Sequence, residues 1–215
     1  MSRTVLVTEG DSPLGAALTR LLLARGCAVV TAVERAPGAP DGEREHVAVT
    51  WNRRSPLSAH TLVRAAANAF SSVDDVLILE PPCAVEKQLL KAESAAIEKA
   101  FDDARGPVFL AREILGHYKR SAGGVLCMVS RGPAAGPVEN AMRECFRGIA
   151  SALLAETGKG TPVVNGFQQG EAGVDEYAAF IDRTLEEKAR KITGRWFTCP
   201  TRGGLFQAVR GPRKG

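Results

Sequence analysis

The sequence predicts an α/β protein, a Rossmann-like doubly wound parallel sheet of seven strands with helices on both faces. Short runs of β-branched and aliphatic residues recur along the chain, and segments with helical spacing of apolar residues lie between them. Such alternation is typical of a parallel sheet that is covered on both sides. The chain has 215 residues, of which 45% are hydrophobic. We therefore expect a single domain over residues 1–215 with a core of its own.

The individual elements follow from this alternation and from the glycines and prolines that interrupt it. Strands are expected at 4–8, 28–33, 46–50, 75–79, 125–129, 162–167 and 196–199. Helices are expected at 13–25, 55–70, 84–91, 101–119, 138–156 and 175–191, and a loop at 36–42. Gly26 stands one residue beyond the first helix, where a glycine commonly ends a helix.

Composition argues against several function classes. The net charge of +4 is spread along the chain, which does not favour nucleic-acid binding, and no apolar run approaches the about 20 residues of a membrane span. The three histidines share no ligand spacing, so we expect no metal site. The cysteines lack C-x-x-C spacing, and we expect buried free thiols at Cys127, Cys145 and Cys199. A cytoplasmic location is the resulting expectation.

The turn that follows the first strand carries the most informative residues. A dinucleotide-binding turn needs glycines, because its backbone N–H groups must approach a pyrophosphate at the start of a helix. Gly10 and Gly15 are present, but Pro13 lacks a backbone donor. Glu9 and Asp11 add carboxylates, each of which would repel a phosphate by roughly 3 kcal/mol at about 5 Å and an effective dielectric of about 20. The turn has the shape of a cofactor site without its chemistry.

Several local sequences together resemble the short-chain dehydrogenase/reductase family over nearly the whole chain. They are Val5-Leu6-Val7-Thr8 with Gly15, Asp74-Asp75-Val76-Leu77-Ile78, Gly123-Gly124-Val125-Leu126-Cys127-Met128-Val129-Ser130, Val163-Val164-Asn165, and Ile192-Thr193-Gly194-Arg195-Trp196-Phe197-Thr198 followed by Gly203-Gly204. The resemblance implies a Rossmann-like fold. It also implies a family chemistry of hydride transfer between NAD or NADP and a carbonyl or alcohol carbon.

The family's cofactor turn, Thr-Gly-x-x-x-Gly-x-Gly, is degenerate in this chain. Only Thr8 and Gly15 match it, Glu9 and Pro13 replace the first two glycines, and Gly10 lies between them. The resemblance therefore implies that this chain binds no cofactor.

Three further cofactor positions depart from the family pattern. Glu34 stands near the place of the family's ribose contact, and Trp51 stands near that of its adenine contact. Leu-Glu-Pro-Pro at 79–82 replaces the family's Asn-Asn-Ala-Gly turn. Trp51 either fills the adenine slot or leaves it as a pocket, and the sequence does not distinguish the two.

The family's catalytic residues are mostly replaced. The resemblance places Glu139 at the Tyr that acts as acid and base, Arg143 at the Lys that lowers its pKa, and Asp103 at the Asn of the proton relay. Ser130 matches the family's Ser. Glu139 and Arg143, four residues apart on one helix, are expected to form an ion pair. The segment that covers substrate in the family, before the last helix, is reduced to a few residues around 169–174.

The losses act on one function, and they suggest a non-catalytic subunit. Its partner would be an active dehydrogenase of the same fold that carries NAD or NADP. The two would associate through helices 101–119 and 138–156 and the C-terminal helix and strand, and would form a hetero-oligomer, expected to be a tetramer. The chain resembles the inactive kind of subunit in hydroxybenzylsuccinyl-CoA dehydrogenase, which would make the partner's substrate a hydroxyacyl-CoA. Two alternatives stay open: a divergent active oxidoreductase that uses Ser130, and a homo-oligomeric binding or regulatory protein with a repurposed cleft.

Overall fold

The computed structural model describes residues 2–35, 45–156 and 162–200. The expected 36–42 loop and the Gly203-Gly204 turn both lie outside these residues. Within them, seven parallel strands form one sheet in the order β3-β2-β1-β4-β5-β6-β7. They are β1 Thr4–Val7, β2 Ala28–Val33, β3 His46–Thr50, β4 Asp75–Leu79, β5 Val125–Ser130, β6 Val163–Gln168 and β7 Trp196–Thr198. The predicted fold class is confirmed.

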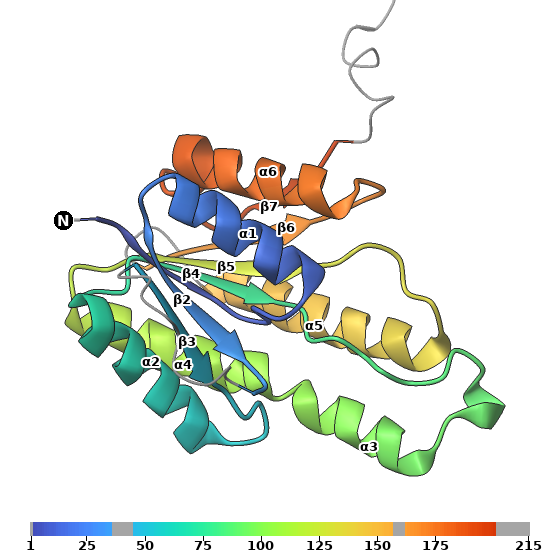
Figure 1. Cartoon of the computed structure of the whole chain (residues 1–215). Coiled ribbons are helices and arrows are strands. Elements are labelled where there is room, and N and C mark those ends of the chain that lie inside the picture. Colours follow the sequence, from blue (N-terminus) through green and yellow to red (C-terminus); the bar gives the residue numbers. More distant parts are fainter. Residues whose placement is uncertain (1, 36–44, 157–161, 201–215) are drawn as a thin grey trace, which may run out of the picture.

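Helices cover both faces of the sheet (Figure 1). One face carries α1 (Pro13–Ala24) and α6 (Val174–Thr184), and α6 continues into a π-helical turn at Leu185–Ala189. The other carries α2 (Pro56–Phe70), α4 (Gly106–Arg120) and α5 (Pro137–Glu156). The core accordingly has two apolar layers, one around Leu18, Leu22 and Phe167, and one around Leu62, Ile114 and Phe146. The strand order reverses between β1 and β4, where ligands of open α/β sheets commonly bind.

The start and end of α1 follow the sequence signals. Ser12 caps the helix by accepting from the Gly15 N–H through its hydroxyl, and Pro13 occupies the first turn, where no donor is needed. Gly26 has a φ of 75° just beyond the helix, as expected for a residue in the left-handed region. The residues from 9 to 15 therefore act as a helix start.

The region between β4 and α4 differs from the prediction. No helix spans 84–91; the chain has no regular structure from 80 to 88 and then makes a single 3₁₀ turn at Leu89–Lys91. The apolar residues that suggested a helix find no core, and Leu90 is fully exposed. The prolines at 81 and 82 keep the start of this segment out of the helical region.

The expected helix at 101–119 is also wrong as one element. It is divided into α3 (Ser94–Asp103) and α4, which begins with Gly106 and Pro107. Pro107 cannot donate to a preceding turn, so it suits a helix start. A Cβ on Gly106 would lie only 2.7 Å from the Cβ of Arg53, so the chain passes very close to the segment after β3. Figure 1 shows α3 projecting beside α5.

Cysteine burial is predicted only in part. Cys127 and Cys199 are buried, but Cys145 is exposed. α5 buries Met142, Phe146, Ala150 and Leu154, at intervals of four residues, and Cys145 lies off this face. Among the described residues, no helix is long and apolar enough to cross a membrane, and no group of three or more His, Cys, Asp or Glu could hold a metal ion.

The fully buried Asn165 in β6 fixes the end of the domain. Its side-chain amide donates to the carbonyl of Ala189 at 2.8 Å and to that of Ile192 at 2.6 Å. Its side-chain oxygen accepts from the Arg195 N–H at 3.0 Å. One side chain thus satisfies three backbone groups of the segment that leads into β7.

We expect Asn165→Ala to lower the free energy of unfolding by about 2–4 kcal/mol, because it leaves buried backbone groups without partners. Urea denaturation followed by circular dichroism measures this change. Asn140→Ala on the exposed face of α5 is the matched control, with an expected change below about 0.5 kcal/mol. Equal effects of the two substitutions would contradict the assigned role of Asn165.

Candidate functional site

The turn after β1 is closed by the side chain that replaces the family's first glycine. Glu9 has a φ of 54°, in the left-handed region that favours glycine, and it is only 1% exposed. Gly15 lies so close to the backbone of Glu9 that a Cβ on Gly15 would be 2.1 Å from the carbonyl oxygen of Glu9. Ser12, through its hydroxyl and its carbonyl, accepts from the N–H groups of Gly15 and Ala16. Those N–H groups of the helix start are therefore already bonded within the turn.

Glu9 forms a buried, two-pronged ion pair with Arg53, which follows β3. Nε of Arg53 donates to Oε1 at 2.8 Å, and Nη2 donates to Oε2. Arg53 is 6% exposed, its guanidinium lies 5.8 Å from the centre of the Trp51 ring, and its Nη1 is 4.0 Å from Oε2 of Glu34. The pair joins the turn after β1 to the segment after β3 and rests on the start of α4 at Gly106. No local pattern predicts this pair, because the partners are 44 residues apart.

Burial and the ion pair shift each pKa of this pair in opposite directions. It raises the pKa of the Glu9 carboxyl above 4.5, and the hydrogen bond and charge of Arg53 offset only part of that effect. Burial alone would lower the pKa of Arg53, but the hydrogen bond and the charge of Glu9 outweigh it and raise the pKa. Each charge is tolerated at this place because the other is present.

A cavity of about 590 Å³ remains beyond the pair, at the carboxyl ends of β2 and β3. Its lining residues are Asp11, Glu34, Arg35, Trp51, Asn52, Arg53, Arg54 and Asp103. Trp51 is 2% exposed and packs into the core, so it forms a wall and leaves the cleft open as a pocket. Asp103, which the resemblance places at the Asn of the family's proton relay, lies here at the end of α3, 2.6 Å from Nζ of Lys99 and 3.9 Å from Nε of Arg54.

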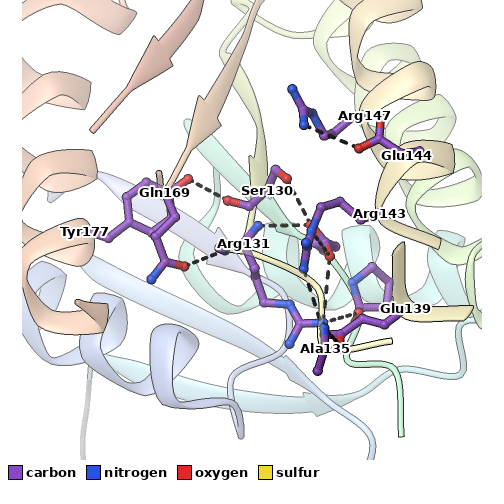
Figure 2. Close-up of polar contacts among 12 residues, drawn as sticks. Ser130, Arg131, Ala135, Glu139, Arg143, Glu144, Arg147, Gln169 and Tyr177 are labelled. Carbon is purple, nitrogen blue, oxygen red and sulfur yellow. Dashed lines mark hydrogen bonds and ion pairs between the residues drawn. The ribbon is translucent and has the colours of Figure 1, made fainter. Parts of the chain in front are cut away.

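The other three residues of the degenerate catalytic set come together around Glu80, which follows β4. Glu80 is 3% exposed, and its Oε2 accepts from the Ser130 hydroxyl and the Arg131 N–H, both at 3.0 Å. Its Oε1 lies 3.5 Å from Nε of Arg143. The expected Glu139–Arg143 ion pair is confirmed, with 3.9 Å between Nη2 and Oε1. Figure 2 shows Arg143 between Ser130 and Glu139.

This cluster holds no phenol in place of the family's acid and base. Tyr177 lies beside Ser130 (Figure 2), but its hydroxyl donates to the Ser130 carbonyl at 2.9 Å. The hydroxyl of Tyr118 bonds the carbonyls of Asp74 and Val125. Burial raises the pKa of both phenols well above 10. Neither is placed or tuned for proton transfer near neutral pH.

The segment that would cover a substrate is short. β6 ends at Gln168 and α6 begins at Val174, with five residues between them. Gln169 bridges this connection to the loop after β5, since its Oε1 accepts from the Gly132 N–H at 2.9 Å and its Nε2 donates to the Ala172 carbonyl at 2.7 Å. The connection acts as a strap between two loops and leaves no residues for a lid.

Comparison with known proteins gives a clear match in structure alone. No protein-family model matches the chain, and no curated protein matches it. A short-chain dehydrogenase/reductase from Serratia marcescens superposes with a TM-score of 0.73 at 16% identity, covering 91% of this chain and 95% of that one. The NADH-dependent reductase A1-R′ complexed with NAD superposes with a TM-score of 0.75 at 17% identity, covering 92% of this chain and 94% of that one. ElxO with NADP bound superposes with a TM-score of 0.78 at 13% identity, covering 93% of this chain and 97% of that one. The chain has the fold of these oxidoreductases.

The Glu9–Arg53 pair generates a double-mutant prediction. Arg53→Met should cost about 3–5 kcal/mol of unfolding free energy, and Glu9→Gly roughly 2–4, because relief of the strained backbone offsets part of the loss. The double variant should lie within about 2 kcal/mol of the native chain, since no unpaired charge remains. Denaturant unfolding of the four proteins measures the coupling. The exposed pair Arg20–Asp175 serves as control, with an expected coupling below about 1 kcal/mol.

A pH prediction follows from the raised pKa of Glu9. Arg53→Met removes the main group that lowers this pKa and leaves only the weaker effect of Arg131, so the folded-state pKa of Glu9 rises further above its unfolded value near 4.5. The stability contributed by protonated Glu9 is full below the unfolded pKa and is lost as pH rises through the folded pKa. The deficit of Arg53→Met relative to the native chain should therefore grow from pH 5 to pH 8, by at most about 1.4 kcal/mol per pH unit.

The measurement is urea unfolding at several pH values, reported as differences from the native chain. Burial also raises the pKa of Asp75, but that group is common to all variants and cancels in the difference. Arg54→Met, at a half-exposed neighbouring position, is the control and should give a deficit that does not change with pH. A flat profile for Arg53→Met would show that Glu9 stays ionised without its partner.

Proposed function

We propose that this chain is a non-catalytic member of the short-chain dehydrogenase/reductase family, and that it supports an active dehydrogenase of the same fold. The observation that carries the proposal is the Glu9–Arg53 pair. A pyrophosphate bound at this turn would meet the buried Glu9 carboxylate where the family has a glycine. Loss of that carboxylate would leave Arg53 without its hydrogen-bonded partner. The fold supports family membership, and the replaced residues support loss of chemistry.

The cluster around Glu80 supports the same proposal. A working member of the family needs a proton donor beside the reacting oxygen and a lysine that tunes it. Here Glu139 accepts from the Ala135 N–H at 2.7 Å, and Ser130 donates to Glu80. The retained hydroxyl therefore serves a structural hydrogen bond. A divergent active enzyme would have to displace both contacts.

The exposed side of α5 is the surface we assign to the partner. The large apolar residues of this helix serve the chain's own core. Its outer face instead carries small residues, which let a second helix approach closely: Ala141, Cys145, Gly148, Ala152 and Ala155. A Cβ on Gly148 meets nothing within 4 Å. On α4, Val108 is 42% exposed, and Phe101 at the end of α3 is 54% exposed. Together with the C-terminal helix and strand, these faces would build a hetero-tetramer.

The active partner would carry the NAD or NADP and the proton-transfer residues. A hydroxyacyl-CoA is the substrate we propose for it, as in hydroxybenzylsuccinyl-CoA dehydrogenase. This chain would stabilise the partner by mass action, because association favours the folded state of both chains.

The cavity of about 590 Å³ favours a second candidate, a homo-oligomeric binding or regulatory protein. Its volume lies within the range of small-molecule sites, and its walls carry both carboxylates and guanidinium groups. A stable homo-oligomer formed without any dehydrogenase would support this candidate over the first.

Co-expression with an active dehydrogenase of the same fold tests the proposal. We expect the two chains to copurify and the isolated chain to bind neither NADH nor NADPH at micromolar concentrations, as measured by fluorescence titration. Gly148→Arg should abolish copurification without destabilising the chain, because the added side chain enters open space. Ala69→Arg, on the exposed part of α2, is the matched control and should leave copurification intact. Micromolar cofactor binding by the isolated chain would refute the proposal.

A further inference from the structure

A second cavity, of about 320 Å³, lies at the carboxyl ends of β5, β6 and β7, beside α5. It shares no lining residue with the larger cavity. Its lining residues are Ser130, Arg131, Gly132, Pro133, Arg143, Arg147, Gln168, Gln169, Gly170, Glu171 and Thr198. Its volume is at the lower end of the range for small-molecule sites and suits one small metabolite.

The charge of this lining is unbalanced. Three guanidinium groups, those of Arg131, Arg143 and Arg147, face one carboxylate, that of Glu171. The remaining polar side chains are hydroxyls and amides, which can donate hydrogen bonds. Glu80, Glu139 and Glu144, the acidic neighbours of these arginines, are not among the lining residues. The lining therefore offers an anion three guanidinium groups and several neutral donors.

Arg143 has unused donors. Its side chain is 7% exposed, yet its two carboxylate contacts are long, 3.5 Å to Glu80 and 3.9 Å to Glu139. Hydrogen-bonded guanidinium–carboxylate pairs lie at about 2.7–2.9 Å. Its Nε is buried and lacks a hydrogen-bond partner among the described residues. A buried charged donor without a close partner is costly, and the guanidinium that carries it belongs to a side chain that lines the cavity.

Arg131 shows the same underuse. Its Nη2 donates to the Pro81 carbonyl at 3.0 Å but lies 3.8 Å from both Glu80 and Glu139. Within the described part of the chain, its Nε is also buried without a partner. The two carboxylates are engaged elsewhere, since Glu80 accepts from Ser130 and Glu139 accepts from the Ala135 N–H. The two carboxylates therefore neutralise part of the charge of the arginines, but they do not occupy all of the arginine N–H donors.

We propose that this cavity binds the anionic oxygens, a carboxylate or a phosphate group, of a small metabolite. Arg143 offers the forked donor that recognises two oxygens of such a group, and Arg131 and Arg147 supply the surrounding charge. The site lies where the family's chemistry would occur, but it requires no nicotinamide. It is independent of the association surface on the outer face of α5.

Calorimetric titration of the full-length native chain at constant low ionic strength tests the site, with inorganic phosphate and malonate as separate probes. At least one probe should bind saturably with one site per chain, and the probe that binds identifies the ligand class. Arg143→Gln should weaken binding about 10- to 100-fold, the value of a charge-assisted hydrogen bond. Arg143→Lys, which keeps the charge but not the fork, should fall between the native chain and Arg143→Gln.

Arg147→Gln provides a variant that should fold normally, because Arg147 is 42% exposed and only pairs with Glu144 at 3.4 Å. It should weaken binding several-fold. The matched control is Arg20→Gln, which removes an exposed arginine with one carboxylate contact at 3.3 Å, far from the cavity. It should leave the affinity unchanged. The proposal fails if neither probe binds saturably to the native chain, or if Arg147→Gln and Arg20→Gln weaken binding equally.

Discussion

The buried ion pair between Glu9 and Arg53 is the constraint on which the shape of the site depends. It places a carboxylate at a backbone position that favours glycine and encloses it among core residues. Neither charge is stable there alone, because an unpaired charge in the interior costs several kcal/mol. The pair therefore fixes the relative positions of the turn after β1, the segment after β3 and the start of α4. These segments form one end of the cleft in which this fold holds a dinucleotide.

The second acidic residue at the switch point plays a parallel part. Glu9 lies beyond β1 and Glu80 beyond β4, the two strands between which the sheet order reverses. Glu80 gathers the Ser130 hydroxyl, the Arg131 N–H and the Arg143 guanidinium. Each carboxylate thus organises groups that, in an oxidoreductase of this fold, would face cofactor or substrate. In this chain both positions are held by internal electrostatic contacts.

The sequence predicts the sheet well, because buried parallel strands leave a local signal. β2, β3 and β4 begin and end as expected, since each is an apolar run bounded by polar or turn residues. The errors lie where local pattern and burial diverge. The 84–91 segment carries leucines that the fold never covers, and the long helix expected at 101–119 breaks where Gly106 must approach Arg53.

The residues that define the site were harder to predict than the strands. Arg53 and Arg54 are adjacent and chemically identical, yet one side chain is 6% exposed and the other 51%. Only the folded chain shows which of them meets Glu9. Glu80 was recognised as part of a replaced turn, but its role as an acceptor for Ser130 depends on the pairing of β4 with β5. Charge partners distant in sequence have no local periodicity from which they could be predicted.

Coupling between these residues explains why the replacements occur together. A glycine at position 9 alone would restore the turn's backbone freedom but leave Arg53 buried without its partner. A lysine at position 143 alone would restore one family residue, yet Glu80 would still hold the Ser130 hydroxyl. Residues that share a network contribute non-additively to stability, so the effect of each single change depends on its neighbours. Restoring the family's residues at positions 9 and 143 would therefore need paired changes, because each of these positions contacts a residue at another point of the cleft.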